Sequence, residues 1–170
     1  MKRRSFFSVF AVLAGAAGVL AIGGCKKNDA AAALYPVAPA WRLKDLQGQD
    51  VTLSQFKGKV VIVDFWATWC APCRAEMPAY VALHKQFEER GLVIVGISLD
   101  AQGPGVVQKF TDSLGITYPI VMGNDEVTEA YQVQVMPTTF VVDREGRIRH
   151  KKVGAIADQV EFEKLIASFL

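Results

Sequence analysis

The chain has 170 residues, of which 51% are hydrophobic and 21% are charged, and its formal net charge is +2. This length predicts one domain with a substantial core. Its 14 Gly, 7 Pro and 3 Cys exclude the collagen-like, disordered and disulfide-dense classes of protein.

The first 24 residues are predicted to be a lipoprotein signal peptide. Lys2, Arg3 and Arg4 form a basic start, and an apolar run from Phe6 to Ile22 follows it. Cys25 comes directly after two glycines, which resembles the position where a bacterial lipoprotein carries its lipid. A plain signal peptide with an incidental cysteine, or an uncleaved anchor, is the alternative. In each case the domain is expected to work outside the cytoplasm.

Removal of this signal peptide would change the sign of the net charge. The signal peptide contains three of the 19 basic residues, so its removal would leave 16 basic and 17 acidic residues and a net charge of about −1. This balance gives no argument for a nucleic-acid partner. Residues 25–39 are predicted to be a flexible tether, since their alanines and prolines bury little. Residues 40–170 are predicted to be the folded domain.

The domain shows signals for strands that alternate with helices. The first are a hairpin around Gln47–Gln49, a buried strand from Val60 to Trp66, and a helix after Cys70 with a kink at Pro78. The later ones are a strand from Leu92 to Leu99, a helix around Phe110, a strand from Tyr118 to Met122, a helix from Glu126 to Tyr131, a hairpin of Thr138–Val142 and Arg147–Val153, and a last helix that Asp158 caps. This order predicts a three-layer α/β sandwich.

Two cysteines lie where the buried strand meets the helix. Cys70 and Cys73 have two residues between them and can close a small disulfide ring across the first helical turn. The free N–H groups and the dipole at a helix start favour a thiolate at Cys70. Such sites lower a thiol pKa from about 8.5 into the range of about 3.5–7.5. Cys73, one turn inside the helix, is placed to resolve a mixed disulfide.

Other uses of this cysteine pair fit less well. A structural zinc site needs four ligands, and the domain offers Cys70, Cys73, His84 and His150 at wide spacing. Both histidines are expected at the surface. Haem attachment needs a histidine after the second cysteine, where this chain has Arg74. A passive structural disulfide rarely spans so tight a loop. Redox chemistry that needs no metal or organic cofactor is therefore favoured.

Three segments resemble the thioredoxin superfamily. Residues 63–73 are similar to its active-site segment, residues 136–140 to its cis-proline loop and residues 142–148 to its final hairpin. The N-terminal hairpin, the insert after Leu99 and the secretion signal resemble the extracytoplasmic TlpA/ResA-like thiol–disulfide oxidoreductases. This resemblance implies a thioredoxin-like three-layer sandwich with an N-terminal β-hairpin and a central helix–strand insert.

The resemblance also implies where substrate binds. It predicts a cis bond between Met136 and Pro137 in a loop that packs over the disulfide and pairs with substrate peptide. Trp69 and Pro72 are assigned to the same substrate-binding surface. Trp66 is expected either to line the site or to belong to the core.

Two carboxyl groups are further candidates for the catalytic site. Asp64 interrupts the apolar strand, so it needs a raised pKa or a partner. It resembles the buried acid of thioredoxin, which accepts the proton of the resolving cysteine, although the extracytoplasmic branch often has Asn there. A partly solvated Asp at a strand end is the alternative. Glu76 resembles the branch's active-site Glu, which influences thiol acidity, or else simply complements the dipole in the first helical turn.

The resemblance implies reduction of disulfides in protein substrates, including the cysteines of apocytochrome c, with recycling by a membrane thiol electron donor. One alternative is a thiol peroxidase, because peroxiredoxins share the fold. They favour Thr three residues before the reactive cysteine, whereas Thr68 is two before Cys70. Another alternative is a non-catalytic binding module or holdase for cysteine-containing chains.

Overall fold

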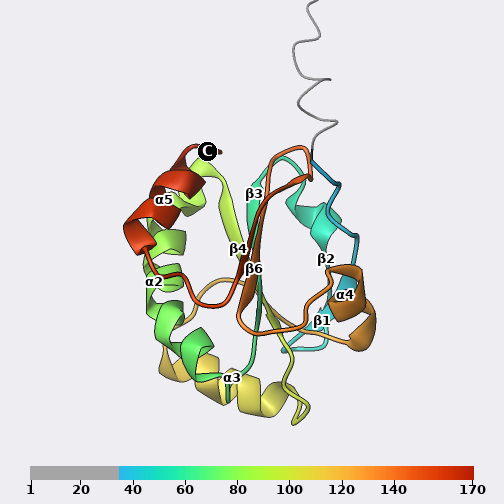
Figure 1. Ribbon diagram of the computed structural model, residues 1–170. Helices are drawn as coiled ribbons and strands as arrows, with labels where there is room; N and C mark the ends of the chain where they lie inside the picture. Colours follow the sequence, from blue (N-terminus) through green and yellow to red (C-terminus); the bar gives the residue numbers. More distant parts are fainter. Residues whose placement is uncertain (1–34) are drawn as a thin grey trace, which may run out of the picture.

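The computed structural model describes residues 35–170 and shows one mixed sheet with helices on both faces (Figure 1). The seven strands lie in the order β2-β1-β5-β4-β3-β6-β7. They are β1 (Arg42–Asp45), β2 (Asp50–Thr52), β3 (Val60–Trp66), β4 (Leu92–Ser98), β5 (Ile120–Met122), β6 (Thr138–Val142) and β7 (Ile148–Val153). The helices are η1 (Leu53–Phe56), α2 (Ala71–Phe87), η2 (Glu88–Arg90), α3 (Pro104–Ser113), α4 (Asp125–Ala130) and α5 (Gln159–Ala167).

Strand β3 lies at the centre of the sheet, as its continuous apolar sequence predicts. It runs parallel to β4 and antiparallel to β6, and all seven of its residues are buried. Ile62 and Trp66 enter the core beneath α2, α3 and α5, whereas Val63 and Phe65 enter the core on the opposite face, beneath α4. The thioredoxin-like three-layer architecture is confirmed.

The N-terminal hairpin and the central insert meet along one side of the sheet. Strand β1 pairs antiparallel with both β2 and β5, and β5 pairs parallel with β4. Helix α3 is the helix of this insert, and its Phe110 ring lies 5.7 Å from that of Trp66. Gly96 on β4 makes this packing close, because a Cβ there would lie 2.8 Å from Nε1 of Trp66. Trp66 is therefore a core residue.

The contacts of the domain begin within the stretch that the sequence assigns to the tether. Val37 forms a β-bridge with Arg147, and the N–H of Ala38 donates to the carbonyl of Gly146 at 2.9 Å. The hydroxyl of Tyr131 donates to the carbonyl of Pro39 at 2.9 Å. The predicted signal peptide, Cys25 and the first part of the tether lie outside the described residues. Within residues 35–170, no helix is long and apolar enough to span a membrane.

His84 departs from the expectation of a surface residue. It is buried on α2, with its ring 5.9 Å from that of Tyr118 and its Nδ1 3.6 Å from Oε2 of Glu88. Burial lowers the pKa of His84, and Glu88 partly opposes that shift. The expectation was wrong because Tyr118, which comes from the insert, covers this side of the helix.

Candidate active site

The two cysteines form a disulfide at the start of α2. Their Sγ atoms are 2.01 Å apart and their Cα atoms 5.3 Å apart. Cys70 caps the helix, and its sulfur accepts a hydrogen bond from the N–H of Cys73 at 3.3 Å. Pro72 fits the first turn because the N–H that it lacks has no partner within a helix at that position. Cys70 is 6% exposed and Cys73 1%, so Cys70 is the more accessible cysteine.

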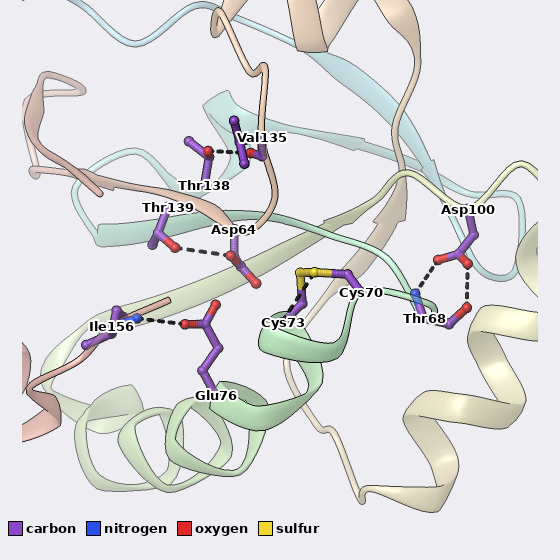
Figure 2. Close-up of a disulfide and its surroundings, with 10 residues drawn as sticks. All are labelled: Asp64, Thr68, Cys70, Cys73, Glu76, Asp100, Val135, Thr138, Thr139 and Ile156. Carbon is purple, nitrogen blue, oxygen red and sulfur yellow. Dashed lines mark hydrogen bonds between the residues drawn. A yellow bond between two sulfur atoms is a disulfide. The ribbon is translucent and has the colours of Figure 1, made fainter. Parts of the chain in front are cut away.

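The loop before β6 has the predicted backbone geometry. The peptide bond between Met136 and Pro137 is cis, as the resemblance implies. The carbonyl of Pro137 accepts from the N–H of Gly154 at 2.8 Å, and the hydroxyl of Thr138 donates to the carbonyl of Val135 at 2.7 Å. Met136 is half-buried and packs against the core that contains both cysteines. Figure 2 shows this turn in the surroundings of the disulfide.

The residues around Cys70 differ sharply in exposure. Trp69, which directly precedes Cys70, is 66% exposed, whereas Trp66 is fully buried. Pro72 and Arg74 are also exposed on the first turn of α2. An apolar, solvent-facing surface therefore adjoins the more accessible sulfur.

Asp64 is a buried acid rather than a solvated one at a strand end. It is 2% exposed and lies on the α2 face of β3, directly opposite Thr139 on β6. The hydroxyl of Thr139 donates to its Oδ1 at 3.1 Å. Burial raises the pKa of Asp64 well above its usual range, and the charge of Glu76 raises it further, while the Thr139 hydrogen bond acts in the opposite direction.

Glu76 is also buried, and it lies beyond the first turn of α2. It is 4% exposed, its Oε2 accepts from the N–H of Ile156 at 3.1 Å, and its Oε1 has no hydrogen-bond partner among the described residues. Burial raises the pKa of Glu76 to about 7, while the Ile156 N–H and the charge of Lys152 act to lower it. The interpretation as a simple complement to the helix dipole is therefore wrong.

Asp100 is a site residue that the sequence analysis missed. Its carboxylate accepts from the N–H of Thr68 at 2.9 Å, from the Thr68 hydroxyl, and from the hydroxyl of Ser98 at 2.8 Å. Thr68 follows β3 and Asp100 follows β4, and these strands are parallel neighbours that end at the same edge of the sheet. That juxtaposition is the signal that could have found it. Asp100 fixes the loop that leads into Cys70 (Figure 2).

A second missed feature is a hydrogen bond between Tyr80 and Thr139. Their side-chain oxygens are 2.9 Å apart, and both residues are buried. Because Thr139 also contacts Asp64, the hydroxyl of Tyr80 is linked to the buried acid. Within residues 35–170, no group of three or more His, Cys, Asp or Glu side chains is arranged to hold a metal ion.

Comparisons with known proteins show which family this chain belongs to. A model of the AhpC/TSA family matches residues 36–151. The thiol-disulfide oxidoreductase ResA of Geobacillus kaustophilus is 33% identical over 153 residues, which cover 89% of this chain and 87% of the relative. ResA of Bacillus subtilis is 35% identical over 124 residues, which cover 72% of this chain and 69% of the relative.

Solved structures show the same fold. A thiol:disulfide interchange protein from Chlorobium tepidum superposes with a TM-score of 0.73 at 30% identity, covering 79% of this chain and 96% of that protein. StoA from Bacillus subtilis superposes with a TM-score of 0.63 at 26% identity, covering 75% of this chain and 96% of StoA. The chain therefore belongs to the AhpC/TSA family and is a thiol–disulfide oxidoreductase of the ResA type.

Proposed function

We propose that the protein is a membrane-tethered, extracytoplasmic enzyme that reduces disulfides in other proteins. The observation that carries this proposal is the asymmetry of the cysteine pair. Cys70 caps α2 and follows the exposed Trp69, whereas Cys73 is buried within the first turn of α2. A pair of this kind can exchange with a large external partner through one sulfur only, which suits a stepwise reaction.

In the proposed reaction the Cys70 thiolate attacks a substrate disulfide and forms a mixed disulfide. The first substrate sulfur leaves as a thiolate and takes a proton from water. Cys73 then gives its proton to Asp64 and attacks the sulfur of Cys70. The bond between Cys70 and the substrate breaks, the second substrate sulfur leaves as a thiolate that takes a proton from water, and the enzyme disulfide re-forms. The substrate gains two electrons and the enzyme loses two.

Four residues are proposed to bind the substrate chain. Trp69 and Pro72 supply exposed apolar surface beside Cys70, and Met136 and Pro137 supply the backbone of the cis-proline loop. Because the carbonyl of Pro137 is already bonded to the N–H of Gly154, the backbone before the proline, at Met136, is proposed to pair with an extended substrate peptide. Glu76 is proposed to tune the acidity of the thiols through its charge. The chemistry requires no cofactor.

The partners follow from the proposed direction. Oxidised protein chains, among them apocytochrome c, are the proposed substrates, and a membrane thiol donor returns the enzyme to its dithiol state. Cys25 is the proposed lipid anchor, and a doubly or triply acylated cysteine would hold the protein stably at a membrane. Expression of a Cys25→Ser variant tests this part, because it should move the protein from the membrane fraction to the soluble fraction.

Direction is tested by the reduction potential. Equilibration with glutathione should place the Cys70–Cys73 couple near the value of thioredoxin, about −270 mV. A value near about −120 mV, that of the oxidant DsbA, would overturn the reducing role while leaving disulfide exchange intact.

The contacts of Thr68 weigh against a thiol peroxidase. Its hydroxyl donates to Asp100, so it is already engaged away from Cys70. Hydrogen peroxide consumption should accordingly be much slower than disulfide reduction. A holdase is separated by a Cys70→Ser variant, which would keep full partner function if the cysteines served binding alone.

A further inference from the structure

Three buried side chains from three elements form a continuous hydrogen-bonded chain beside the disulfide. Tyr80 extends from α2, Thr139 lies on β6 and Asp64 lies on β3. The Tyr80 and Thr139 oxygens are 2.9 Å apart, and Thr139 Oγ1 lies 3.1 Å from Asp64 Oδ1. None of the three is more than 2% exposed. Water therefore has little access to these bonds.

The number of available protons sets the direction of this chain. Thr139 has a single hydroxyl proton, and an ionised Asp64 can only accept. Thr139 must then donate to Oδ1 and accept from Tyr80. Burial raises the pKa of Tyr80 and so keeps its phenol protonated. Among the described residues, the Tyr80 hydroxyl has Thr139 as its hydrogen-bond partner. Oδ1 is thereby held as an acceptor, while the other oxygen of Asp64, Oδ2, is turned toward Cys73 and Glu76 (Figure 2).

We propose that Tyr80 and Thr139 are positioning residues that direct the proton of Cys73 onto Oδ2 of Asp64. This inference rests on the proposed function, in which Asp64 is the proton acceptor. In that step the S–H bond of Cys73 breaks, an O–H bond forms at Oδ2, and the Cys73 thiolate displaces the substrate sulfur from Cys70. Protonation at Oδ1 is disfavoured, because Thr139 would then accept from Oδ1, and either its own hydroxyl proton or the phenol proton of Tyr80 would lose its acceptor within this chain of bonds.

Loss of either hydroxyl has a defined consequence. Without Tyr80's phenol, Thr139 is free to accept a hydrogen bond from a protonated Oδ1, so the neutral acid gains a hydrogen bond and Thr139 is no longer held as a donor to the ionised acid. The pKa of Asp64 then rises. The titratable groups that face Asp64 are Cys73, Glu76 and Tyr80 on α2 and Tyr118 ahead of β5. The variants must therefore be compared at the same pH and in the same redox state, so that these groups carry the same charges.

The resolving step can be followed with 5,5′-dithiobis(2-nitrobenzoate). Attack by Cys70 on this reagent releases one coloured thiolate, and attack by Cys73 on the resulting mixed disulfide releases the second. The rate of the second release is measured in stopped flow from pH 5 to pH 10. Asp64→Asn should remove the inflection that belongs to the acceptor. Thr139→Val should move that inflection upward by about one pH unit, the size expected for losing one hydrogen bond to a charged group.

Tyr80→Phe should move the inflection in the same direction by a smaller amount, and Thr139→Ser should restore the profile of the unaltered protein. Tyr118→Phe is the matched control, because it removes a buried phenol near the same carboxyl groups that has no bond to Thr139. Its profile should be unchanged.

The outcomes separate the two proposals. If Asp64→Asn alters the profile while Tyr80→Phe and Thr139→Val overlay the unaltered protein, the positioning role is overturned and the acceptor role of Asp64 stands. If Asp64→Asn also overlays it, the positioning role fails with the acceptor role. If Cys70→Ser still releases both thiolates, the proposed function itself is wrong.

Discussion

The carboxyl groups of Asp64 and Glu76 face one another beside the Cys70–Cys73 disulfide (Figure 2). Both are buried, and the charge of Glu76 raises the pKa of Asp64. The sequence resemblance relates Asp64 to thioredoxin and Glu76 to the extracytoplasmic branch, and this chain places both acids at one site. Their titrations belong to the pair, since each ionisation disfavours the other.

This pair predicts how stability depends on pH in the oxidised protein, whose active-site cysteines carry no thiol. A raised pKa in the folded state means that the folded protein binds more protons than the unfolded chain. The contribution of Glu76 to stability is therefore complete below about pH 4.3 and is lost as the pH rises toward about 7. In that window the contribution of Glu76 to the free energy of unfolding falls by at most about 1.4 kcal/mol per pH unit.

Denaturant unfolding from pH 4 to pH 8 checks this expectation. Glu76→Gln should make the decline in the free energy of unfolding less steep across that window, while the contribution of Asp64, whose pKa is also raised, remains. Glu89→Gln, which alters an exposed carboxyl just beyond α2, is the control and should keep the decline. Equal slopes in the two variants would show that Glu76 is not titrating in this range.

A second prediction concerns the reactivity of Cys70 in the reduced protein. Glu76 is ionised above about pH 7, and its negative charge disfavours a nearby thiolate. Glu76→Gln should therefore shift the alkylation profile of Cys70 with iodoacetamide to lower pH. An unshifted profile would remove Glu76 from the tuning of this thiol.

The Asp100 contacts predict that the loop before Cys70 depends on a residue from β4's end. Asp100→Ala leaves the Thr68 N–H without its acceptor, so we expect a loss of about 1–3 kcal/mol in the free energy of unfolding and slower alkylation of Cys70. Asp112→Ala, at an exposed site on α3, should change neither quantity. A stable Asp100→Ala variant with unaltered Cys70 kinetics would contradict this role.

The two tryptophans near the cysteines should behave oppositely. Trp66→Ala removes a fully buried ring and should cost about 3–5 kcal/mol of stability. Trp69→Ala removes an exposed ring and should leave stability within about 0.5 kcal/mol, while raising the KM for a protein disulfide. Thermal unfolding and steady-state reduction kinetics measure both. A large loss of stability in Trp69→Ala would place that ring in the core instead.

Local sequence patterns were sufficient for much of this fold. The apolar run of β3 predicted a central strand, and a cysteine at the strand–helix junction predicted the cap of α2. The cis bond at Pro137 came from the resemblance, because a proline alone makes cis only an option. These features depend on neighbours in the chain.

The missed features depend on contacts between distant segments. Thr68 and Asp100 are 32 residues apart, and Tyr80 and Thr139 are 59 apart. The periodicity of apolar residues could not predict either contact. Burial of His84 likewise depends on a tyrosine from the insert. The register between β3 and β6 would have placed Thr139 opposite Asp64, but the register follows only once the topology is known.

The role of Cys70 as the attacking sulfur is tested most directly by a trapping experiment on the cysteine pair. Reduced Cys73→Ala, mixed with a disulfide-containing protein, should form a stable mixed disulfide through Cys70, which tryptic mass spectrometry can locate. Cys70→Ala, which keeps the buried Cys73, should form a mixed disulfide much more slowly than Cys73→Ala does. Trapping through Cys73, or full reductase activity in Cys70→Ala, would contradict the assignment of Cys70 as the attacking sulfur.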